Sequence, residues 1–251
     1  MKYLSLFIIS IIGSALFGQQ NEQYQKALAF KNESKFELAL PIFQQLLKSD
    51  SGNVDYLHNT SFLYSKLGFR QKTEAEQQKW YRIAEYLGKK AIAANDKSAD
   101  AHYTYALALG RINENASSKV KIANAKLIKG EADKAIALNP KLAGPFHIMG
   151  RWHRTIAGFS SIEKMMINAF FGGVPPGGTY DDAIKNFSAA IALEPAYSLH
   201  MYELAMTYYE RDAASEMIYA KVWAEKALKC PVLNDDDRET QKKLNELLKK
   251  L

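Results

Sequence analysis

Apolar residues recur along most of the chain at intervals of three and four positions, which is the period of amphipathic helices. Two almost identical segments, AIALNP at residues 135–140 and AIALEP at residues 190–195, end such stretches, and a fainter copy, AIAAND, occupies residues 91–96. Their small residues allow another helix to approach closely, and proline prevents the helix from continuing. Another amphipathic stretch follows each proline. The pattern predicts repeated helical hairpins, and no segment shows the alternation of a β-strand.

Five hairpin units can be placed along the chain, and they resemble tetratricopeptide repeats. The units cover roughly residues 20–52, 54–98, 99–142, 143–197 and 198–231, and a Lys-rich helix follows over about residues 235–251. This last helix begins with NDDD, whose carboxylates suit a helix N-terminus, and its polar character suits the end of a solenoid. The expected fold is all-α: an α-solenoid of about five tetratricopeptide-like helical hairpins with an inserted helix and a C-terminal capping helix.

The spacing of the units is uneven. Ala91, Ala135, Ala190 and Ala227 occupy equivalent places and lie 44, 55 and 37 residues apart, whereas a plain repeat takes about 34 residues. Several units must therefore contain extra residues between their two helices. The longest insertion covers approximately residues 154–179.

The insertion has its own helical signals. Ser160 and Glu163 predict a capping box, and Thr179 with Asp182 predicts the start of the next helix. Between them, residues at helical spacing form one apolar face: Ile162, Met165, Met166, Ala169 and Phe170. We expect this face to pack across the repeat groove, and the alternative is a helix that lies in a membrane interface.

The first twenty residues, MKYLSLFIISIIGSALFGQQ, differ from the rest. One Lys precedes an apolar run over residues 4–17 that small residues interrupt, which is the plan of a secretory signal peptide. We expect residues 1–18 to be that signal and residues 19–251 to be the repeat domain, exported to a periplasm or secreted. The alternative is an uncleaved membrane anchor formed by residues 4–17.

Composition and charge exclude few classes of function. The chain has 251 residues, of which 47% are hydrophobic and 24% charged, with a net charge of +6. Because Lys and Glu are interleaved, the charge indicates a solvated helical surface and not a nucleic-acid footprint. Cys230 is the only cysteine, so the protein has no internal disulfide, and we expect it to be a small, half-buried packing residue.

Four segments carry a more specific similarity. They are GRW at residues 150–152, AGFSSIEK at 157–164, FFGGVPPGGTYDDA at 170–183 and WAEKAL at 223–228. Together they resemble the family of regulators of microtubule dynamics. The resemblance implies a helical-repeat protein without catalysis, and eukaryotic members associate with microtubules or organelle membranes through protein contacts. The short, signal-like N-terminus departs from those members.

The resemblance also implies a structural motif around the insertion, in which GRW holds the insertion helix. Because Trp152 lies on an amphipathic helix, we expect it to pack under the insertion and not to be exposed. The residues that match this motif are Gly150, Trp152, Phe171, Gly172, Pro175, Thr179 and Tyr180.

The repeats themselves predict a binding groove. In stacked hairpins the first helix of each unit lines a concave surface, and its second, fifth, ninth and twelfth residues face that surface. Arginines beside aromatic side chains are typical of protein recognition, and two Arg on one face could bind the carboxylate of an acidic peptide or of a protein's C-terminus. The alternative is that the Tyr and His residues only pack between helices. The candidate groove residues are His58, Tyr103, His147, Arg151, Arg154, Tyr202, Met206 and Tyr209.

Catalysis and cofactors are not expected. The five His residues show no metal-binding spacing, and His147 and His153 lie on nearly opposite sides of a helix. The GGVPPGG segment has two prolines where a phosphate loop needs N–H donors, and no GxSxG motif or isolated carboxylate pair occurs. The sequence therefore predicts a non-catalytic scaffold that binds a protein or peptide, with no metal, cofactor or nucleic acid. The alternatives are a membrane-anchored adaptor, or a lipid or small-molecule carrier whose cavity the insertion helix covers.

Overall fold

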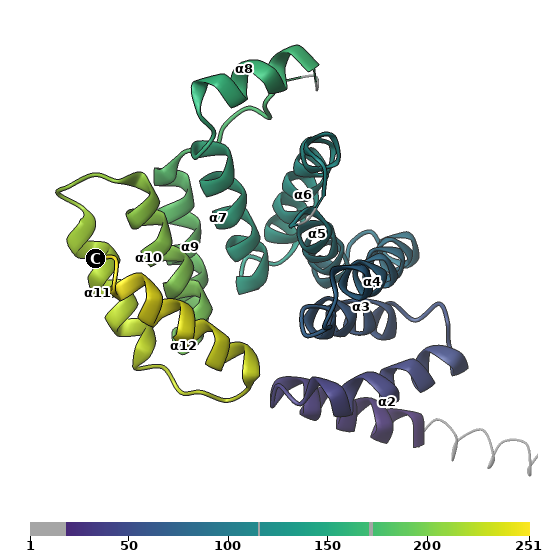
Figure 1. The fold of residues 1–251 in the computed structure, drawn as a ribbon. Helices are drawn as coiled ribbons and strands as arrows, with labels where there is room; N and C mark the ends of the chain where they lie inside the picture. The colour runs from purple at the N-terminus through teal and green to yellow at the C-terminus, as the bar shows by residue number, and fades with distance from the viewer. Residues whose placement is uncertain (1–18, 115, 171–172) are drawn as a thin grey trace, which may run out of the picture.

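The computed structural model describes residues 19–114, 116–170 and 173–251, and every regular element in them is helical (Figure 1). A helix occupies residues 19–32 at the start of the described region. The helices that follow are α2 (Phe36–Ser49), α3 (Val54–Gly68), α4 (Glu74–Ala94), α5 (Ala99–Asn113), α6 (Ser118–Leu138), α7 (Ala143–Ala157), α8 (Ser161–Phe170), α9 (Tyr180–Leu193), α10 (Ser198–Arg211), α11 (Met217–Leu228) and α12 (Asp235–Leu248). The predicted all-α solenoid with an inserted helix and a terminal helix is confirmed.

The helices pair as the repeat pattern predicts. The helix over residues 19–32 packs on α2, where the Tyr24 and Phe43 rings lie 6.0 Å apart. Four further hairpins join α3 with α4, α5 with α6, α7 with α9, and α10 with α11, and α12 packs on α10 and α11. The first helices of neighbouring units, α3, α5, α7 and α10, also contact one another in turn. They form one continuous layer, which we call the inner surface. None of the helices described here is both long and apolar enough to cross a bilayer.

Local sequence signals fix several helix starts. The Thr73 hydroxyl accepts a hydrogen bond from the backbone N–H of Glu76, and the Glu76 carboxylate accepts one in return. The same reciprocal arrangement joins Asn234 and Asp237 at the start of α12, while Thr179 begins α9. Each cap satisfies backbone donors that the helix cannot, and is worth about 1 kcal/mol. The predicted starts at Thr179 and at NDDD are correct.

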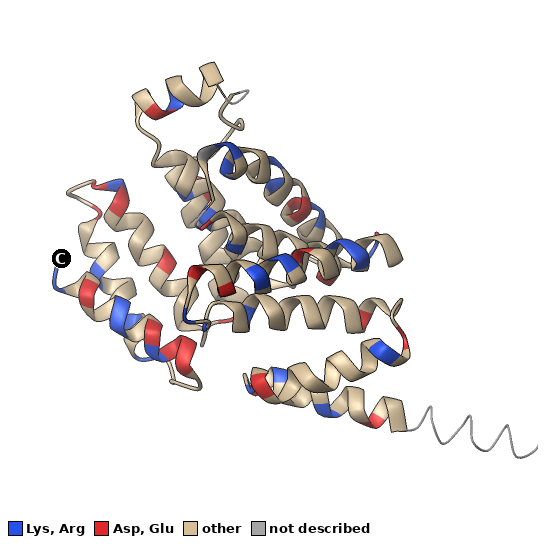
Figure 2. Cartoon of the chain, turned by 45° about the vertical axis from the view of Figure 1, so that its right-hand side comes forward, with Lys and Arg blue, Asp and Glu red and all other residues tan. Residues whose placement is uncertain are grey.

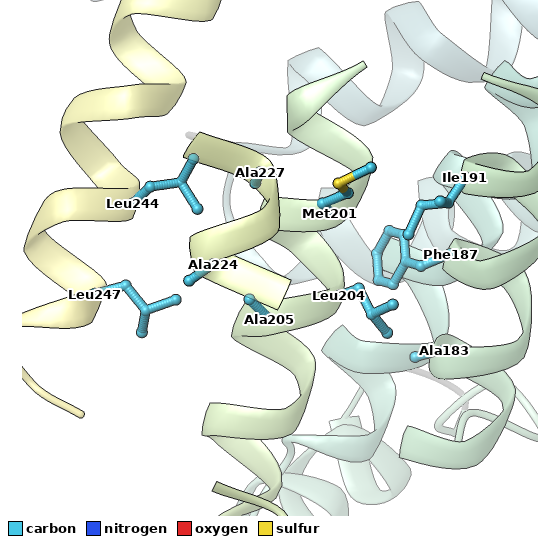
Figure 3. Close-up of a cluster of buried hydrophobic side chains, with 10 residues drawn as sticks. All are labelled: Ala183, Phe187, Ile191, Met201, Leu204, Ala205, Ala224, Ala227, Leu244 and Leu247. Atoms are coloured by element: carbon cyan, nitrogen blue, oxygen red, sulfur yellow. The ribbon is translucent and has the colours of Figure 1, made fainter. Parts of the chain in front are cut away.

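Small residues make the hairpins tight. Ala91, Ala135, Ala190 and Ala227, the alanines that the repeat pattern aligned, are all fully buried. In the C-terminal cluster, Leu244 and Leu247 of α12 point toward the alanines of α11, and Phe187 lies on the other side of α10 (Figure 3). The terminal helix therefore covers apolar surface that the last hairpin would otherwise expose.

The array curves until its ends meet. The guanidinium of Arg70, after α3, donates to the Asp236 carboxylate of α12 at 3.0 Å and also contacts Glu37 of α2. The Lys66 ammonium of α3 donates to the Tyr197 hydroxyl at the start of α10 at 3.0 Å. The contacts to Asp236 and Tyr197 join residues that are 166 and 131 positions apart in the sequence. Figure 1 shows the α12 segment returning to the neighbourhood of α2 and α3.

The insertion helix α8 does not pack as the sequence pattern predicted. Its capping box forms, because the Ser160 hydroxyl and the Glu163 carboxylate each accept a backbone hydrogen bond from the other residue. The side chains of the expected apolar face, however, are exposed, and Ile167, which is not one of them, is the buried residue of α8. Helical periodicity correctly located an apolar face but could not show which surface that face meets. The expectation that it packs across the groove is wrong.

Candidate partner-binding surface

Tyr103 of α5 packs between neighbouring first helices. Its ring lies 6.4 Å from the Phe62 ring of α3 and directly over Gly144 of α7, where a Cβ atom would stand only 2.3 Å from the Tyr103 ring. Burial raises the pKa of the Tyr103 hydroxyl well above its usual range. Tyr103 therefore contributes mainly to packing along the inner surface.

A pair of histidines, the buried His200 and the partly buried His147, joins α7 to α10. The Nδ1 atoms of His147 and His200 lie 2.8 Å apart, so one ring must donate and the other accept. The other ring nitrogen of His200 faces the Glu194 carboxylate at 3.2 Å, and His147 stands edge-on to the Phe187 ring. Burial, followed by the neighbouring His200 and then Arg151, holds the pKa of His147 well below its ordinary value. His147 is therefore neutral in the folded protein at pH 7.

One buried carboxylate holds the two candidate arginines. The Arg154 guanidinium of α7 lies 2.5 Å from the Glu203 carboxylate of α10 and donates to the Glu203 carbonyl oxygen at 3.0 Å. It also reaches Glu210 at 3.4 Å. Although burial opposes ionisation, Arg154 and then Arg151 keep the pKa of Glu203 below its usual value. Arg154 is thus fully engaged within the protein, where it stabilises an ionised carboxylate.

Arg151 is held more loosely than Arg154. Its guanidinium lies 3.7 Å from Glu203 and 3.4 Å from Glu114, and 41% of its side chain remains exposed, against 14% for Arg154. Both contacts are longer than a well-formed charge-assisted hydrogen bond. Arg151 is therefore the arginine of this pair that retains donors for another carboxylate.

Both cations and carboxylates surround Arg151. Lys66 of α3 donates to the Tyr197 hydroxyl, and the Tyr197 ring lies 4.8 Å from the His200 ring of the histidine pair. Arg111 pairs with Glu114 at 3.0 Å, so Glu114 is shared between two arginines. Tyr202 of α10 lies close enough to influence Arg151, and its hydroxyl pKa is raised by burial and then by Glu203.

The structure divides the predicted groove residues into two groups. It brings together His147, Arg151, Arg154 and Tyr202, which with Glu203 we call the arginine cluster. Met206 and Tyr209 pack against the C-terminal hydrophobic cluster, as Tyr202 also does. His58 is nearly buried, with its ring nitrogen 3.3 Å from Asp55 in the same helix, and none of its contacts reaches the cluster. The packing alternative therefore describes His58, Tyr103, Met206 and Tyr209.

Sequence reasoning missed Glu203, Glu114 and His200. Glu203 lies in YELAM, and its apolar neighbours were the available sign that this carboxylate is buried and needs a cationic partner. The partner itself could not be identified from sequence, because Arg154 belongs to the preceding unit.

Trp152 packs beside the insertion, as expected. It is buried, and its indole N–H donates to the Ala125 carbonyl oxygen of α6 at 2.9 Å. Phe159 and Val174, on either side of α8, pack on the same cluster as Trp152. The segment that enters and leaves α8 is therefore fixed at its base.

Other motif residues act locally. Gly150 faces the Phe187 ring, which a Cβ atom there would approach to 2.6 Å, and the Tyr180 hydroxyl donates to the Glu210 carbonyl oxygen. Pro175 is buried in the loop, while Phe171 and Gly172 lie outside the described residues. The described residues contain no group of three or more His, Cys, Asp or Glu side chains placed to hold a metal ion. Cys230 is half-buried and packs beside the C-terminal cluster, as expected.

Comparison with known proteins gives consistent results. Residues 19–251 match the family profile described as regulator of microtubule dynamics protein 1-3. Regulator of microtubule dynamics protein 1 of Bos taurus is 34% identical over 180 residues, which cover 70% of this chain and 55% of the relative. Protein 3 of Rattus norvegicus is 28% identical over 210 residues, covering 82% of this chain and 44% of the relative. The matched region is therefore about half the length of these relatives.

A solved structure supports the fold. A thermophilic tetratricopeptide-repeat protein of Thermus thermophilus superposes with a TM-score of 0.65 over 91% of this chain and 98% of that protein. Its sequence identity is 16%, so the likeness concerns the fold alone.

Proposed function

Because the chain belongs to the family of regulator of microtubule dynamics proteins 1–3 and has a tetratricopeptide-like fold, we propose that it is a non-catalytic scaffold that binds a protein or peptide on its inner surface. The observation that carries the proposal is the partly exposed Arg151, which faces the interior beside Tyr202 and has only long contacts to its own carboxylates. Repeat scaffolds of this kind use such extended inner surfaces for recognition.

The partner chemistry follows from this geometry. A carboxylate of the partner, from an acidic residue or from its C-terminus, would accept hydrogen bonds from Arg151 in place of the weak contact to Glu114. Arg154 would not contact the partner directly. By holding Glu203 ionised, it keeps an anchor for the Arg151 side chain. Tyr202 adds an aromatic surface of the kind enriched at protein interfaces.

The test is affinity capture with the wild-type protein, Arg151→Ala and a matched control. Arg82→Ala is the control, because Arg82 is an exposed arginine of α4 that pairs with Glu85 at 2.9 Å. We expect one protein to be enriched from the cell envelope fraction by the wild type and by Arg82→Ala. Arg151→Ala should retain at least about tenfold less, since a charge-assisted contact is worth about 1.5–3 kcal/mol. Equal capture by all three proteins would contradict the assignment of this surface.

Location in the cell is a separate part of the proposal. We propose that the domain is exported, because the apolar run over residues 4–17 has the plan of a signal peptide. N-terminal sequencing of the protein from its native cells tests this. A new start near residue 19 supports export, whereas an intact Met1 in the membrane fraction supports an anchored adaptor.

An anchored adaptor is the second candidate, and the names of the relatives favour it, since they are regulators of microtubule dynamics. Under that proposal the repeat domain faces the cytosol and its partner belongs to the microtubule system. Co-sedimentation with assembled microtubules separates the candidates. Pelleting of the wild type, reduced in Arg151→Ala, would favour the adaptor.

A further inference from the structure

Helix α8 exposes an unusually large apolar surface. The exposed fractions of Ile162, Met165, Met166 and Phe170 are 69%, 64%, 51% and 74%. Ile162, Met165 and Met166 share one side of the helix, and Phe170 lies at the edge of that side, next to the buried Ile167. Figure 1 shows α8 standing apart from the stacked hairpins. The helix thus presents an apolar face that the rest of the described residues does not cover.

The protein surface next to this apolar face carries lysine side chains. Phe170 lines an open pocket of about 450 Å³ together with Lys119, Ile122, Ala123 and Lys126 of α6. Lys119, Lys121 and Lys126 are all exposed or partly exposed, and no acidic residue occurs in the first turn of α6. On α8 itself Lys164 and Glu163 cancel, and Figure 2 shows the helix otherwise free of charge colours. Charge near the apolar face is therefore predominantly positive.

We propose that α8 docks on an acidic phospholipid surface, with its apolar side chains inserted between the lipids and the α6 lysines at the phosphate groups. An apolar helical face flanked by Lys binds to such a surface, because the burial of apolar area and the attraction to anionic lipids both favour binding. Met, Ile and Phe are long or bulky side chains that reach into the acyl boundary.

The dimensions of α8 agree with docking and not with spanning. Ten residues of helix extend about 15 Å, half of the roughly 30 Å thickness of a bilayer core. The base of the segment is fixed by Phe159 and Val174, which pack on the buried cluster around Trp152. The helix is therefore held outside the body in a fixed place, and its insertion does not require the repeats to unfold.

The test uses the full-length protein and a fluorophore placed on α8. The signal therefore reports the surroundings of α8 and not those of residues 1–18. An environment-sensitive fluorophore is attached to Met165→Cys in a Cys230→Ser background, and a second preparation carries it at Tyr219→Cys on α11, where Tyr219 is 50% exposed. Each is mixed with vesicles of phosphatidylcholine alone, or with one third phosphatidylglycerol, that contain brominated lipid as a depth-dependent quencher.

We expect quenching at position 165 with the acidic vesicles and little with phosphatidylcholine alone or at position 219. Ile162→Glu with Met166→Glu should abolish it. The matched pair Ile218→Glu with Val222→Glu, which charges side chains on α11 that are 58% and 49% exposed, should leave it unchanged. Lys119→Gln with Lys126→Gln should weaken partition by about tenfold or more, because each lysine near an anionic surface contributes to binding.

Three outcomes would overturn the proposal. The first is an unquenched position 165 in both kinds of vesicle. The second is equal quenching at positions 165 and 219, which would mean that the protein does not approach the bilayer through α8. The third is a spectral change at position 165 that appears without vesicles as the protein concentration rises, because the face would then be covered by a second copy of this protein.

Discussion

Glu203 is the residue on which the inner surface depends most. It is 6% exposed, and it stays ionised because Arg154 and Arg151 face it. A buried carboxylate without its cation is far more costly than an exposed guanidinium without its carboxylate. The two arginines, close together on one helix, therefore have different roles: Arg154 stabilises the fold, and Arg151 remains available.

This difference predicts unequal effects on stability. Arg154→Ala should lower the free energy of unfolding by about 3 kcal/mol, because it leaves Glu203 buried without its closest cation. Arg151→Ala should cost about 1 kcal/mol or less, since its contacts to Glu203 and Glu114 are long and partly exposed. Urea unfolding followed by circular dichroism measures both. Similar losses for the two variants would mean that Arg151 is also a structural residue.

The histidine pair predicts a pH dependence. Burial, with His200, Arg151, Lys66 and Arg111 nearby, lowers the pKa of His147 below its ordinary value of 6.5, so the unfolded state binds a proton there that the folded state does not. Stability is therefore fully present above pH 6.5 and is lost as the pH falls below that value. The loss of unfolding free energy between pH 7.5 and pH 5.5 should be smaller in His147→Gln than in the wild type.

His153 is the control for this measurement, because burial also lowers its pKa, although Asp182 opposes the shift. His153→Gln should retain most of the pH dependence. If His147→Gln and the wild type lose the same unfolding free energy, the histidine pair does not titrate as proposed.

At the scale of the element, local sequence predicted the repeats well. The starts at Thr179 and at NDDD were predicted because each depends on a capping side chain within three residues, and Thr73 and Ser98 cap their helices in the same way. The aligned alanines are buried for the same local reason: a close helix pair needs a small residue at that position. The packing of helix α8 could not be predicted equally well, because helical periodicity locates an apolar face but does not show what that face contacts.

The loop after α8 provides a prediction with an internal control. Gly177 and Gly178 both have positive φ, +87° and +92°, so alanine is strained at either position. A Cβ atom at Gly177 meets nothing within 4 Å, whereas one at Gly178 would stand 2.4 Å from the Ile156 side chain of α7. Gly177→Ala should cost about 1 kcal/mol and Gly178→Ala about 1–3 kcal/mol more, measured by thermal or urea unfolding. Equal costs would show that the loop is not held against α7.

At the scale of the whole molecule, the meeting of the two ends was not predictable from sequence. Arg70 bridges Glu37 and Asp236, and Lys66 reaches Tyr197, through contacts that depend on the sum of small rotations over all the repeats. The stacking of the repeats also brings Arg111 and Arg151 to the same Glu114 carboxylate. The helices that face inward could be identified from the sequence. Which distant side chains contact each other depends on the curvature of the whole array.

The central claim is that a partner binds the inner surface, and site-specific photo-crosslinking in living cells tests it most directly. A photoreactive residue replaces Tyr202, which lies beside Arg151, or Tyr86, which is 64% exposed on α4 and serves as the control. The account predicts that position 202 crosslinks to one protein, that Arg151→Ala abolishes this product, and that position 86 gives no such product. Crosslinking of the same protein from position 86, or a product at position 202 that persists in Arg151→Ala, would contradict it.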